Sequence, residues 1–362
     1  MDASLDNARK RINEIDKKMA ELFTERMKAA QEVAEYKRLH GLEIFDERRE
    51  AEVISRNSEL ISDSLIREYY VNFLKENMAI SRAYQARILK GMTVAYSGTE
   101  GAFAHIASRK LFPAARTVAY PDFATAYSAV ESGECDVCVL PIENSYNGEV
   151  TQVSDLMFSG SLYVNGVTEL AVSHDLVALP GATLDDVKEV VSHPQALAQC
   201  AEYIKSRGFE AKEYSNTALA AKYVSERGDK SIAAIASAEA AEIFGLAALE
   251  RNVNSSRTNT TRFAVFARAK NETDKTRMGL HSIMLFTVKH EAGALAKAIE
   301  IIGKHGFNMK ALRSRPMKEL LWQYYFYVEA EGSIDSPEGK EMLEELSKYC
   351  DRLKAIGTYI KE

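Results

Sequence analysis

Three short clusters of polar side chains adjoin apolar, strand-like runs, and they supply the groups best suited to chemistry. The first cluster, Leu140 to Ser145, ends the run from Val137 with a carboxylate, an amide and a hydroxyl. The other two are Ser192 to Gln195 and Asn259 to Phe263. Because open α/β sheets bind their ligands at strand ends, we expect one cleft that is rich in neutral hydrogen-bonding groups and poor in strong bases.

The elements that must position these clusters alternate along the chain from about residue 91. Strand candidates between Thr93 and Ala267 are separated by helical segments, one of them at Pro194 to Arg207, which predicts a mostly parallel sheet layered with helices. The segment Leu162 to Leu179 is strand-like throughout and is expected to cross between two lobes. The chain would return near Ser255 to Thr261, with the cleft between the lobes.

The amino-terminal segment predicts one long helix followed by two shorter ones. Apolar residues recur at mixed spacings of three and four from Leu5 to about His40, with no proline or glycine before Gly41. Such a rod would be about 50 Å long and cannot bury its apolar stripe alone, so we expect an intertwined helical dimer. The shorter helices are expected at about 46–61 and 65–89, with Asp63 as a cap.

Charged and polar side chains on these helices form a second candidate site, suited to a compact dianion. Arg26 and Lys37 lie about 20° from a common face of the first helix. Arg9 lies on a different face and would have to reach the site from a partner chain. The remaining candidates share one face of the second or third helix: Asp46, Arg49, Glu50, Ser81 and Gln85. The alternative interpretation is a solvated charged face.

The carboxy-terminal segment has the pattern of a small separate domain. Asn271 to Gly279 is polar and is interpreted as a linker. The residues from His281 to Ile360 then follow the order strand, helix, strand, strand, helix, strand, with the third strand starting at Trp322. This βαββαβ order within about 80 residues predicts a ferredoxin-like unit.

Length, composition and charge bound the remaining possibilities. At 362 residues the chain is longer than a single hydrophobic core usually organises, so we expect two or three domains. Its content of 46% apolar and 27% charged residues is typical of a soluble globular protein. No apolar run approaches the roughly 20 residues that span a bilayer, and the charged start, Met1 to Arg11, lacks a signal-peptide core. We therefore expect a cytoplasmic protein without membrane contact, and the net charge of −6 argues against general nucleic-acid binding.

The cysteines do not predict a metal or redox site. Cys135 and Cys138 form a C-x-x-C pair, but residues three apart in a strand face opposite sides of the sheet. The other two cysteines, Cys200 and Cys350, do not form a second such pair. We interpret the first pair as structural and expect no bound metal.

Residues 5–89 resemble the all-helical chorismate mutases. The match runs through Arg9, Arg26, Lys37, Asp46, Arg49, Glu50, Ser81 and Gln85. The resemblance implies a pericyclic rearrangement of chorismate to prephenate, in which the site holds the reactive conformer and stabilises charge on the ether oxygen. It implies that Arg9, Arg26 and Arg49 bind the carboxylates of the substrate. It also implies that Lys37 and Gln85 bind the ether oxygen and that Glu50 binds the ring hydroxyl. Because Arg48 stands beside Arg49, the resemblance leaves open which of the two arginines matches the family's position. The spacing from Arg26 favours Arg49.

Residues 91–268 resemble the prephenate dehydratases. The matching stretches are Tyr96 to Phe103, Leu140 to Ser145 with Gly148, Ser192 to Gln199, Asn216 to Ala218, and Thr261 to Phe263. The resemblance implies loss of carboxylate and hydroxide from prephenate, with Thr261 as the group that hydrogen-bonds or protonates the departing hydroxyl. Glu143, if protonated by burial, is a rival donor.

The same resemblance assigns supporting roles. Substrate positioning falls to Asn144, Ser192, Gln199 and Thr217, while Arg262 orients its loop or binds a carboxylate. The alternative for Ser192 and His193 is helix capping ahead of Pro194, a favourable first helical residue. For His193 we favour capping or packing over catalysis.

The final unit resembles the ACT regulatory domains, which bind amino acids between paired subunits. The expected effector residues lie at the start of its first helix and around its second strand: Gly293, Ala294, Leu295, Asn308, Ser314 and Arg315. Arg313 stands where dehydratases usually carry glutamate, a reversal of charge beside the expected effector pocket. The alternative is a pairing domain without a ligand.

Together these resemblances imply a multidomain, bifunctional enzyme of phenylalanine biosynthesis that needs no metal or organic cofactor. The expected domains are a helical mutase domain at 1–90, a two-lobed α/β dehydratase domain like the periplasmic binding proteins at 91–270, and a ferredoxin-like ACT domain at 280–362. Expected partners are chorismate, prephenate, L-phenylalanine as effector, and further copies in a homodimer or homotetramer. The alternatives are a fused arogenate dehydratase and a non-catalytic small-molecule sensor.

Overall fold

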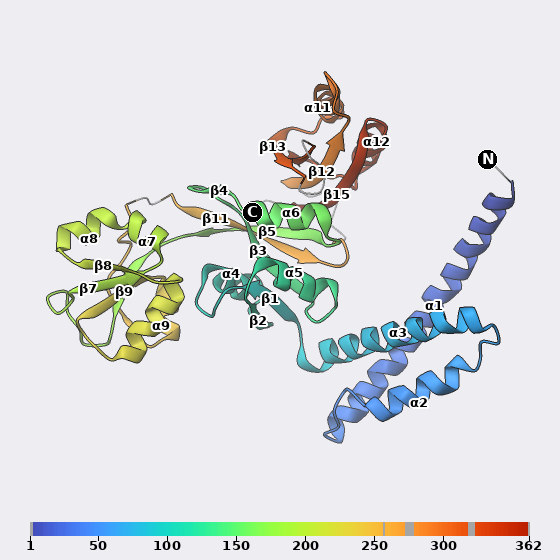
Figure 1. The fold of residues 1–362 in the computed structure, drawn as a ribbon, viewed down its shortest axis with the longest axis horizontal. Helices are drawn as coiled ribbons and strands as arrows, with labels where there is room; N and C mark the ends of the chain where they lie inside the picture. Colours follow the sequence, from blue (N-terminus) through green and yellow to red (C-terminus); the bar gives the residue numbers. More distant parts are fainter. Residues whose placement is uncertain (1–2, 256–257, 272–278, 318–322, 361–362) are drawn as a thin grey trace. The chain divides into compact units, whose positions relative to one another are not determined.

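A computed structural model describes residues 3–255, 258–271, 279–317 and 323–360 (Figure 1). The chain divides into two compact units, Met1–Met92 and Thr93–Glu362. Most of the expected linker at 271–279, and Trp322, lie outside the described residues. Within the described part, no helix combines the length and apolar character needed to cross a bilayer.

The first unit consists of three helices, as the apolar spacing predicts. They are α1 (Ala3–Leu39), α2 (Glu47–Ser58) and α3 (Ser64–Lys90). The predicted cap is confirmed, since the Asp63 carboxylate accepts hydrogen bonds from the backbone of Leu65 and Ile66. Asp46 caps α2 in the same way, accepting from the Arg49 backbone N–H at 2.9 Å.

Helix α1 packs on α3 but leaves most of its apolar stripe uncovered. Met27 and Ala34 are buried against α3, together with Leu74 and Met78 of that helix. The rest of the stripe is exposed in this chain: Leu5, Ile12, Ile15, Met19, Leu22, Phe23 and Val33. Such a run of exposed apolar side chains is typical of a surface that another chain covers.

The second unit begins with a first lobe built on one mixed sheet. Its strand order is β2 (Arg116–Tyr120), β1 (Thr93–Ser97), β3 (Val137–Asn144), β11 (Thr260–Ala267) and β5 (Tyr163–Ala171), with β4 (Gly148–Glu149) paired to β3. The helices α4 (Phe103–Leu111), α5 (Phe123–Glu131) and α6 (Thr151–Ser159) pack against these strands. Cys138 is buried within β3 and Cys135 just before it, and both are free thiols.

The second lobe holds another mixed sheet. Its strand order is β10 (Ala247–Glu250), β6 (Asp175–Ala178), β9 (Ile232–Ala236), β7 (Glu189–Ser192) and β8 (Glu210–Glu213). Its helices are α7 (Pro194–Gln199), α8 (Ala201–Arg207), α9 (Thr217–Arg227) and α10 (Ala238–Ile243), and α7, α8 and α9 lie around the strands in Figure 1. The single helix expected at 194–207 is thus two helices, which meet at Cys200.

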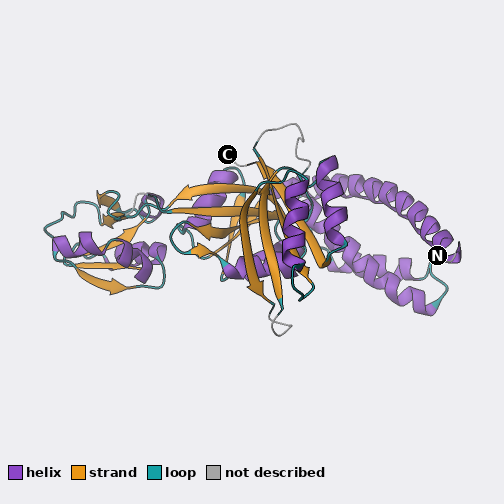
Figure 2. Cartoon of the chain, turned by 90° about the horizontal axis from the view of Figure 1, so that it is seen from above, coloured by secondary structure: helices purple, strands orange, loops and turns teal. Residues whose placement is uncertain are grey.

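The predicted crossing between lobes is confirmed, but the mostly parallel sheet is wrong. The chain leaves the first lobe after β5 and returns before β11, as the extended strands in Figure 2 show. β11 pairs antiparallel with both β3 and β5, and β6 pairs antiparallel with both β9 and β10. The reason is that the crossing segments run as strands through each sheet in place of the helical crossovers that parallel neighbours require.

The C-terminal subdomain, residues 280–360, has the predicted βαββαβ order. It comprises β12 (Leu280–Val288), α11 (Ala294–Lys304), β13 (Met309–Pro316), β14 (Tyr324–Glu331), α12 (Pro337–Ser347) and β15 (Cys350–Ile360). Its antiparallel strands lie in the order β13, β14, β12, β15, which confirms the ferredoxin-like topology. One face of this sheet packs on its two helices. The other shares a core with the first lobe, where Ile283, Leu285 and Tyr327 meet Leu140 and Phe266.

Candidate functional site

The strand pair β3 and β11 brings together the first and third polar clusters. β3 continues to Asn144, so Glu143 and Asn144 lie inside the strand, whereas the sequence suggested that the strand ends before them. The register places Thr261 opposite Asn144. The Asn144 Nδ2 group donates to the Thr261 Oγ1 atom at 2.9 Å, so both side chains lie on the same face of the sheet.

A chain of amide contacts extends from this pair to the second lobe. Asn144 Nδ2 also donates to Asn259 Oδ1 at 2.8 Å, and Asn259 Nδ2 donates to Gln199 Oε1 at 3.2 Å. Gln199 Oε1 lies 3.1 Å from His174 Nε2. A hollow of about 360 Å³ lies beside this network, with Gln199, Asn259 and Asn254 in its lining. Neutral groups of the first and third clusters therefore meet Gln199 at the lobe boundary, whereas in the described part of the chain no residue of the second cluster, Ser192 to Gln195, takes part in this network.

The hydrogen bonds around Asn144 fix what Thr261 can do. Asn144 Oδ1 accepts from the backbone N–H groups of Tyr146 and Asn147, each at 3.0 Å, so its amide nitrogen must face Thr261. Thr261 Oγ1 therefore accepts a hydrogen bond from Asn144, and among the described residues its own proton meets no acceptor. Thr261 is 9% exposed. A hydroxyl held in this way is oriented to donate its proton to a bound ligand.

His174 was missed by sequence analysis because a lone histidine carries no motif. It lies where the chain crosses between lobes, is 2% exposed, and contacts Gln199. Its Nδ1 atom is buried without a hydrogen-bond partner among the described residues. Burial lowers the pKa of His174 below its usual 6.5, an effect that the Gln199 contact and Asp175 only partly oppose. The neutral ring can then donate from Nε2 to Gln199.

This lowered pKa predicts a pH effect on stability. Between the folded pKa and the unfolded value of 6.5, the unfolded chain binds more protons, so stability falls as the pH drops through that window. His174→Gln removes the titration and keeps an N–H group near the Nε2 position. Between about pH 7.5 and about pH 5.5, we expect the urea midpoint of the native protein to fall more than that of the variant. Equal losses in both proteins would exclude a depressed His174 pKa.

The other predicted members of the cleft have more local contacts. Ser192 is fully buried and donates to the Ile235 carbonyl at 2.6 Å, which ties β7 to β9. Thr217 is half-buried at the start of α9, behind the cap residue Asn216. His193 caps α7, accepting from the Gln195 N–H at 3.2 Å, which confirms the capping interpretation.

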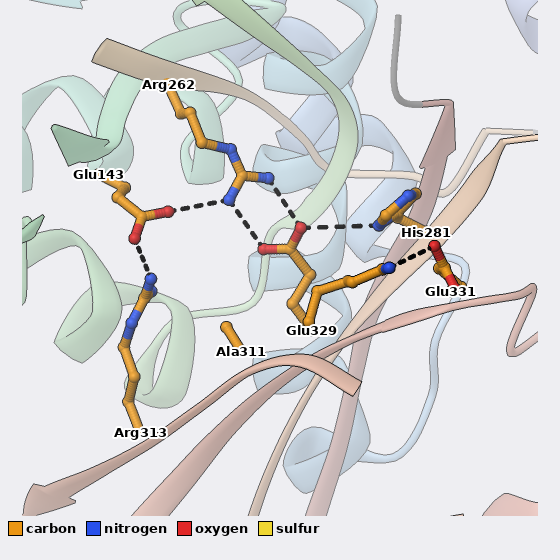
Figure 3. Close-up of a pocket in the computed structure, with 8 residues that line it drawn as sticks. Glu143, Arg262, His281, Ala311, Arg313, Glu329 and Glu331 are labelled. Atoms are coloured by element: carbon orange, nitrogen blue, oxygen red, sulfur yellow. Dashed lines mark hydrogen bonds and ion pairs between the residues drawn. The ribbon is translucent and has the colours of Figure 1, made fainter. Parts of the chain in front are cut away.

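Glu143 and Arg262 do not lie in the cleft. They are paired across β3 and β11 one residue away from Thr261 and Asn144, and neighbouring strand residues point to opposite faces. Arg262 Nη1 donates to Glu143 Oε2 at 2.9 Å, and Arg313 binds the other Glu143 oxygen (Figure 3). The prediction of Glu143 as a rival proton donor is therefore wrong, because its carboxylate is held by two guanidinium groups behind the cleft.

Both Nη groups of Arg262 are engaged on that face, while its Nε atom is buried without a hydrogen-bond partner among the described residues. Its Nη2 group donates to Glu329 Oε1 at 2.8 Å and to the Tyr359 hydroxyl at 2.9 Å. Both terminal nitrogens of Arg262 thus bind protein side chains behind the cleft, so the alternative in which Arg262 binds a substrate carboxylate is wrong. Burial acts to raise the pKa of Glu329, but the hydrogen bonds from Arg262 and Tyr359 outweigh it and lower that pKa.

In the helical unit, Arg26 and Ser81 meet as predicted. The Arg26 guanidinium binds Ser81 Oγ and donates to the Asn77 carbonyl at 3.3 Å. Burial lowers the pKa of Arg26 from its ordinary value, although a guanidinium stays charged in proteins. Gln85 is 8% exposed, and its Oε1 atom has no hydrogen-bond partner among the described residues.

The remaining helical candidates are more dispersed within this one chain. Lys37 Nζ donates to the Ile44 carbonyl at 2.6 Å, and Glu50 is ion-paired with Arg82, which sequence analysis did not single out. Arg49 and Arg9 are exposed. An apolar hollow of about 550 Å³ lies next to Arg26, lined mainly by exposed residues of α1 and α3. One chain therefore supplies only part of a dianion site.

The expected effector residues are divided between two places. Gly293, with a φ of 87° that favours glycine, precedes α11, whose first residues are Ala294 and Leu295. Asn308 donates to Glu331 Oε2 at 2.7 Å, and Ser314 is exposed. Arg315 is instead engaged with the first lobe, 3.3 Å from Asp155 of α6, because odd-numbered residues of β13 face that lobe.

Comparisons with known proteins agree on two families. The model of chorismate mutase type II matches residues 8–86, and that of prephenate dehydratase matches residues 94–271. A bifunctional chorismate mutase/prephenate dehydratase of Neisseria gonorrhoeae is 31% identical over 357 residues, covering 97% of this chain and 95% of that protein. An arogenate dehydratase of Petunia hybrida is 34% identical over 284 residues, covering 74% and 71%. The crystal structure of a prephenate dehydratase from Arthrobacter aurescens in complex with L-Phe is 26% identical, with a TM-score of 0.68, covering 75% and 90%.

Proposed function

This chain belongs to the family of bifunctional chorismate mutase/prephenate dehydratases, and from that premise we propose which residues perform each reaction. The helical unit rearranges chorismate to prephenate, and the two-lobed part converts prephenate to phenylpyruvate, in phenylalanine biosynthesis. We place the domain borders at 1–90, 91–270 and 280–362. The observation that carries the dehydratase assignment is the contact of Asn144 with Thr261 in a cleft of neutral groups.

In the dehydratase step, Thr261 assists the departing hydroxyl of prephenate. The electrons of the bond to the leaving carboxylate move into the ring, carbon dioxide departs, and the carbon–oxygen bond breaks on the other side. The ring gains aromaticity, so the barrier lies chiefly in the departure of hydroxide, which a positioned donor eases. Asn144 supports this role by occupying the acceptor side of the Thr261 hydroxyl, so that its proton faces the leaving group.

Gln199 is suited to hold a carboxylate of the substrate. Its Oε1 atom is occupied by Asn259 Nδ2 at 3.2 Å and by the neutral His174 ring at 3.1 Å. An amide oxygen with two donors fixes the orientation of the whole group, which leaves the two N–H bonds of Gln199 for a ligand. We assign further positioning to Ser192 and Thr217, through the walls of the second lobe.

The mutase site requires a second copy of the chain. The partly buried Arg26 and the buried Ser81 and Gln85 form its floor. We assign Lys37 and Gln85 to the ether oxygen, Arg49 to a carboxylate and Glu50 to the ring hydroxyl. Arg9 is supplied by the partner chain. The exposed apolar stripe of α1 supports this pairing, since a second α1 would bury it.

We further propose that the C-terminal subdomain binds L-phenylalanine between paired subunits. Gly293, Ala294 and Leu295 would offer backbone N–H groups at the start of α11 to the carboxylate of the amino acid. Support comes from the similar prephenate dehydratase structure in complex with L-Phe.

One assay tests this function directly. The purified chain, given chorismate, is expected to release phenylpyruvate, whereas a non-catalytic sensor would consume nothing. Prephenate and arogenate are then compared as substrates by kcat/KM, and we expect prephenate to be preferred. A preference for arogenate would replace the dehydratase assignment, as the similarity to an arogenate dehydratase allows. Added phenylalanine should lower the rate, and an unchanged rate would refute the regulatory assignment.

A further inference from the structure

The strand pair that carries Thr261 has a second face, which does not belong to the cleft. Thr261 and Asn144 contact each other on one side, while Arg262 and Glu143, the next residues along the same strands, pair on the other. Each catalytic or positioning side chain is therefore one peptide unit away from a charged side chain behind the sheet. A shift of the rear residue is therefore expected to move its neighbour in the cleft.

The rear face is held by side chains of the C-terminal subdomain. Glu329 binds Arg262 through both carboxylate oxygens, at 3.0 and 2.8 Å. Tyr359 donates to Glu329 Oε1 at 2.6 Å, and Glu329 is 2% exposed. Figure 3 shows Arg262 between Glu143 and Glu329. These three residues line a hollow of about 460 Å³. The Arg262 side of the network is therefore held by several hydrogen bonds, with Glu329 buried and the Arg262 side chain 15% exposed.

Arg313 completes the network on the β3 side. Its Nη2 group binds Glu143 Oε1, while Arg262 takes the other oxygen, so the two arginines hold the carboxylate from opposite sides. Arg313 also lies over the Tyr327 ring, 5.2 Å from its centroid, which steadies the guanidinium from its own sheet. Among the described residues, Arg313 is the group of the C-terminal subdomain that contacts β3 through Glu143.

We propose that Arg313 is a positioning residue for the dehydratase reaction, which holds Asn144 against Thr261 by binding Glu143 behind β3. This inference rests on the proposed dehydratase function. Arg262 holds Glu143 against β11 and reaches the C-terminal sheet only through Glu329, whereas Arg313 joins Glu143 to that sheet directly. Both contacts are therefore needed to fix the position of β3 relative to the cleft. Misplacement of a reacting group by about 1 Å can lower a rate about 100-fold.

The test uses Arg313→Glu, Arg313→Gln and Arg313→Lys in the full chain, with prephenate as substrate. Arg313→Glu places a carboxylate beside Glu143 and should lower the dehydratase kcat on the order of 10- to 100-fold, with KM changed less. Arg313→Gln removes the charge without adding repulsion, so its kcat should lie between those of the native chain and Arg313→Glu. Arg313→Lys should retain most of the native kcat. Chorismate consumption by the same preparations reports the folded enzyme and should stay unchanged.

Two controls separate positioning from a loosened interface. Arg352→Glu removes another arginine of the C-terminal subdomain, one that donates to the Phe158 carbonyl at 2.9 Å, away from β3. It should leave the dehydratase kcat near the native value. In a Glu143→Gln background, Arg313→Glu should have a much smaller effect than in the native chain, because the repelled carboxylate is gone.

The outcomes are distinguishable. A native chain without activity on prephenate would overturn the proposed function and, with it, this inference. A native chain that is active, with Arg313→Glu and Arg313→Gln within about twofold of its kcat, would overturn the inference alone. So would equal losses in Arg313→Glu and Arg352→Glu, or effects of Arg313→Glu that are the same with and without Glu143.

Discussion

Replacing Thr261 with alanine is expected to lower the dehydratase rate by about 10²- to 10⁴-fold, the usual contribution of a positioned proton donor. The hydroxyl is 9% exposed and accepts a hydrogen bond from Asn144 at 2.9 Å, which leaves its proton for the ligand. Alanine keeps the backbone of β11 and removes only the donor. Chorismate should still be consumed, because the mutase residues lie in the other compact unit.

The measurement follows chorismate, prephenate and phenylpyruvate in one reaction, where the variant should accumulate prephenate. Thr260→Ala is the matched control, since it removes the neighbouring hydroxyl, which points to the opposite face of the strand. Thr261→Ser keeps a hydroxyl and should recover most of the rate. Loss of both activities together in Thr261→Ala, or a Thr260→Ala variant that is equally slow, would count against Thr261 as the donor.

Local patterns predicted the elements of this fold better than their pairing. The apolar spacing on α1 and the acidic cap at Asp63 depend on residues within a few turns, and both predictions are confirmed. The direction of β11 depends on where the chain returns after the whole second lobe, and the sequence near Thr260 carries no sign of it. The small βαββαβ subdomain was predictable because its connections are short and its order is characteristic.

The site was predictable as a set of strand-end clusters, but not as two faces. Once β3 is extended to Asn144, alternation alone places Glu143 behind the sheet, so a longer strand would have corrected its role. His174 had no such signal, because its partner Gln199 is remote in sequence and single histidines are common in cores. The contact of Arg313 with Glu143 joins two sheets and could not be derived from either segment alone.

Replacing Arg26 with alanine is expected to produce the reverse of the Thr261 variant. Arg26 is partly buried against α3, where it binds Ser81 and the Asn77 carbonyl, so its guanidinium is held in place before a substrate arrives. Loss of one buried, hydrogen-bonded charge from a pair costs about 2 kcal/mol or more, which is at least about 30-fold in kcat/KM for chorismate. Conversion of added prephenate should remain at the native rate.

Arg26→Lys and Lys28→Ala show whether the guanidinium itself is responsible. Lysine keeps the charge but lacks the planar fork that binds a carboxylate and Ser81 together, so its kcat/KM should lie between the native and alanine values. Lys28 is an exposed cation on the same helix, and its removal should have little effect. If Arg26→Ala and Lys28→Ala reduce chorismate turnover equally, general attraction of the dianion explains the loss and Arg26 is not a substrate ligand. If only Arg26→Ala loses chorismate turnover and the variant still forms the dimer, we infer that Arg26 binds a substrate carboxylate directly.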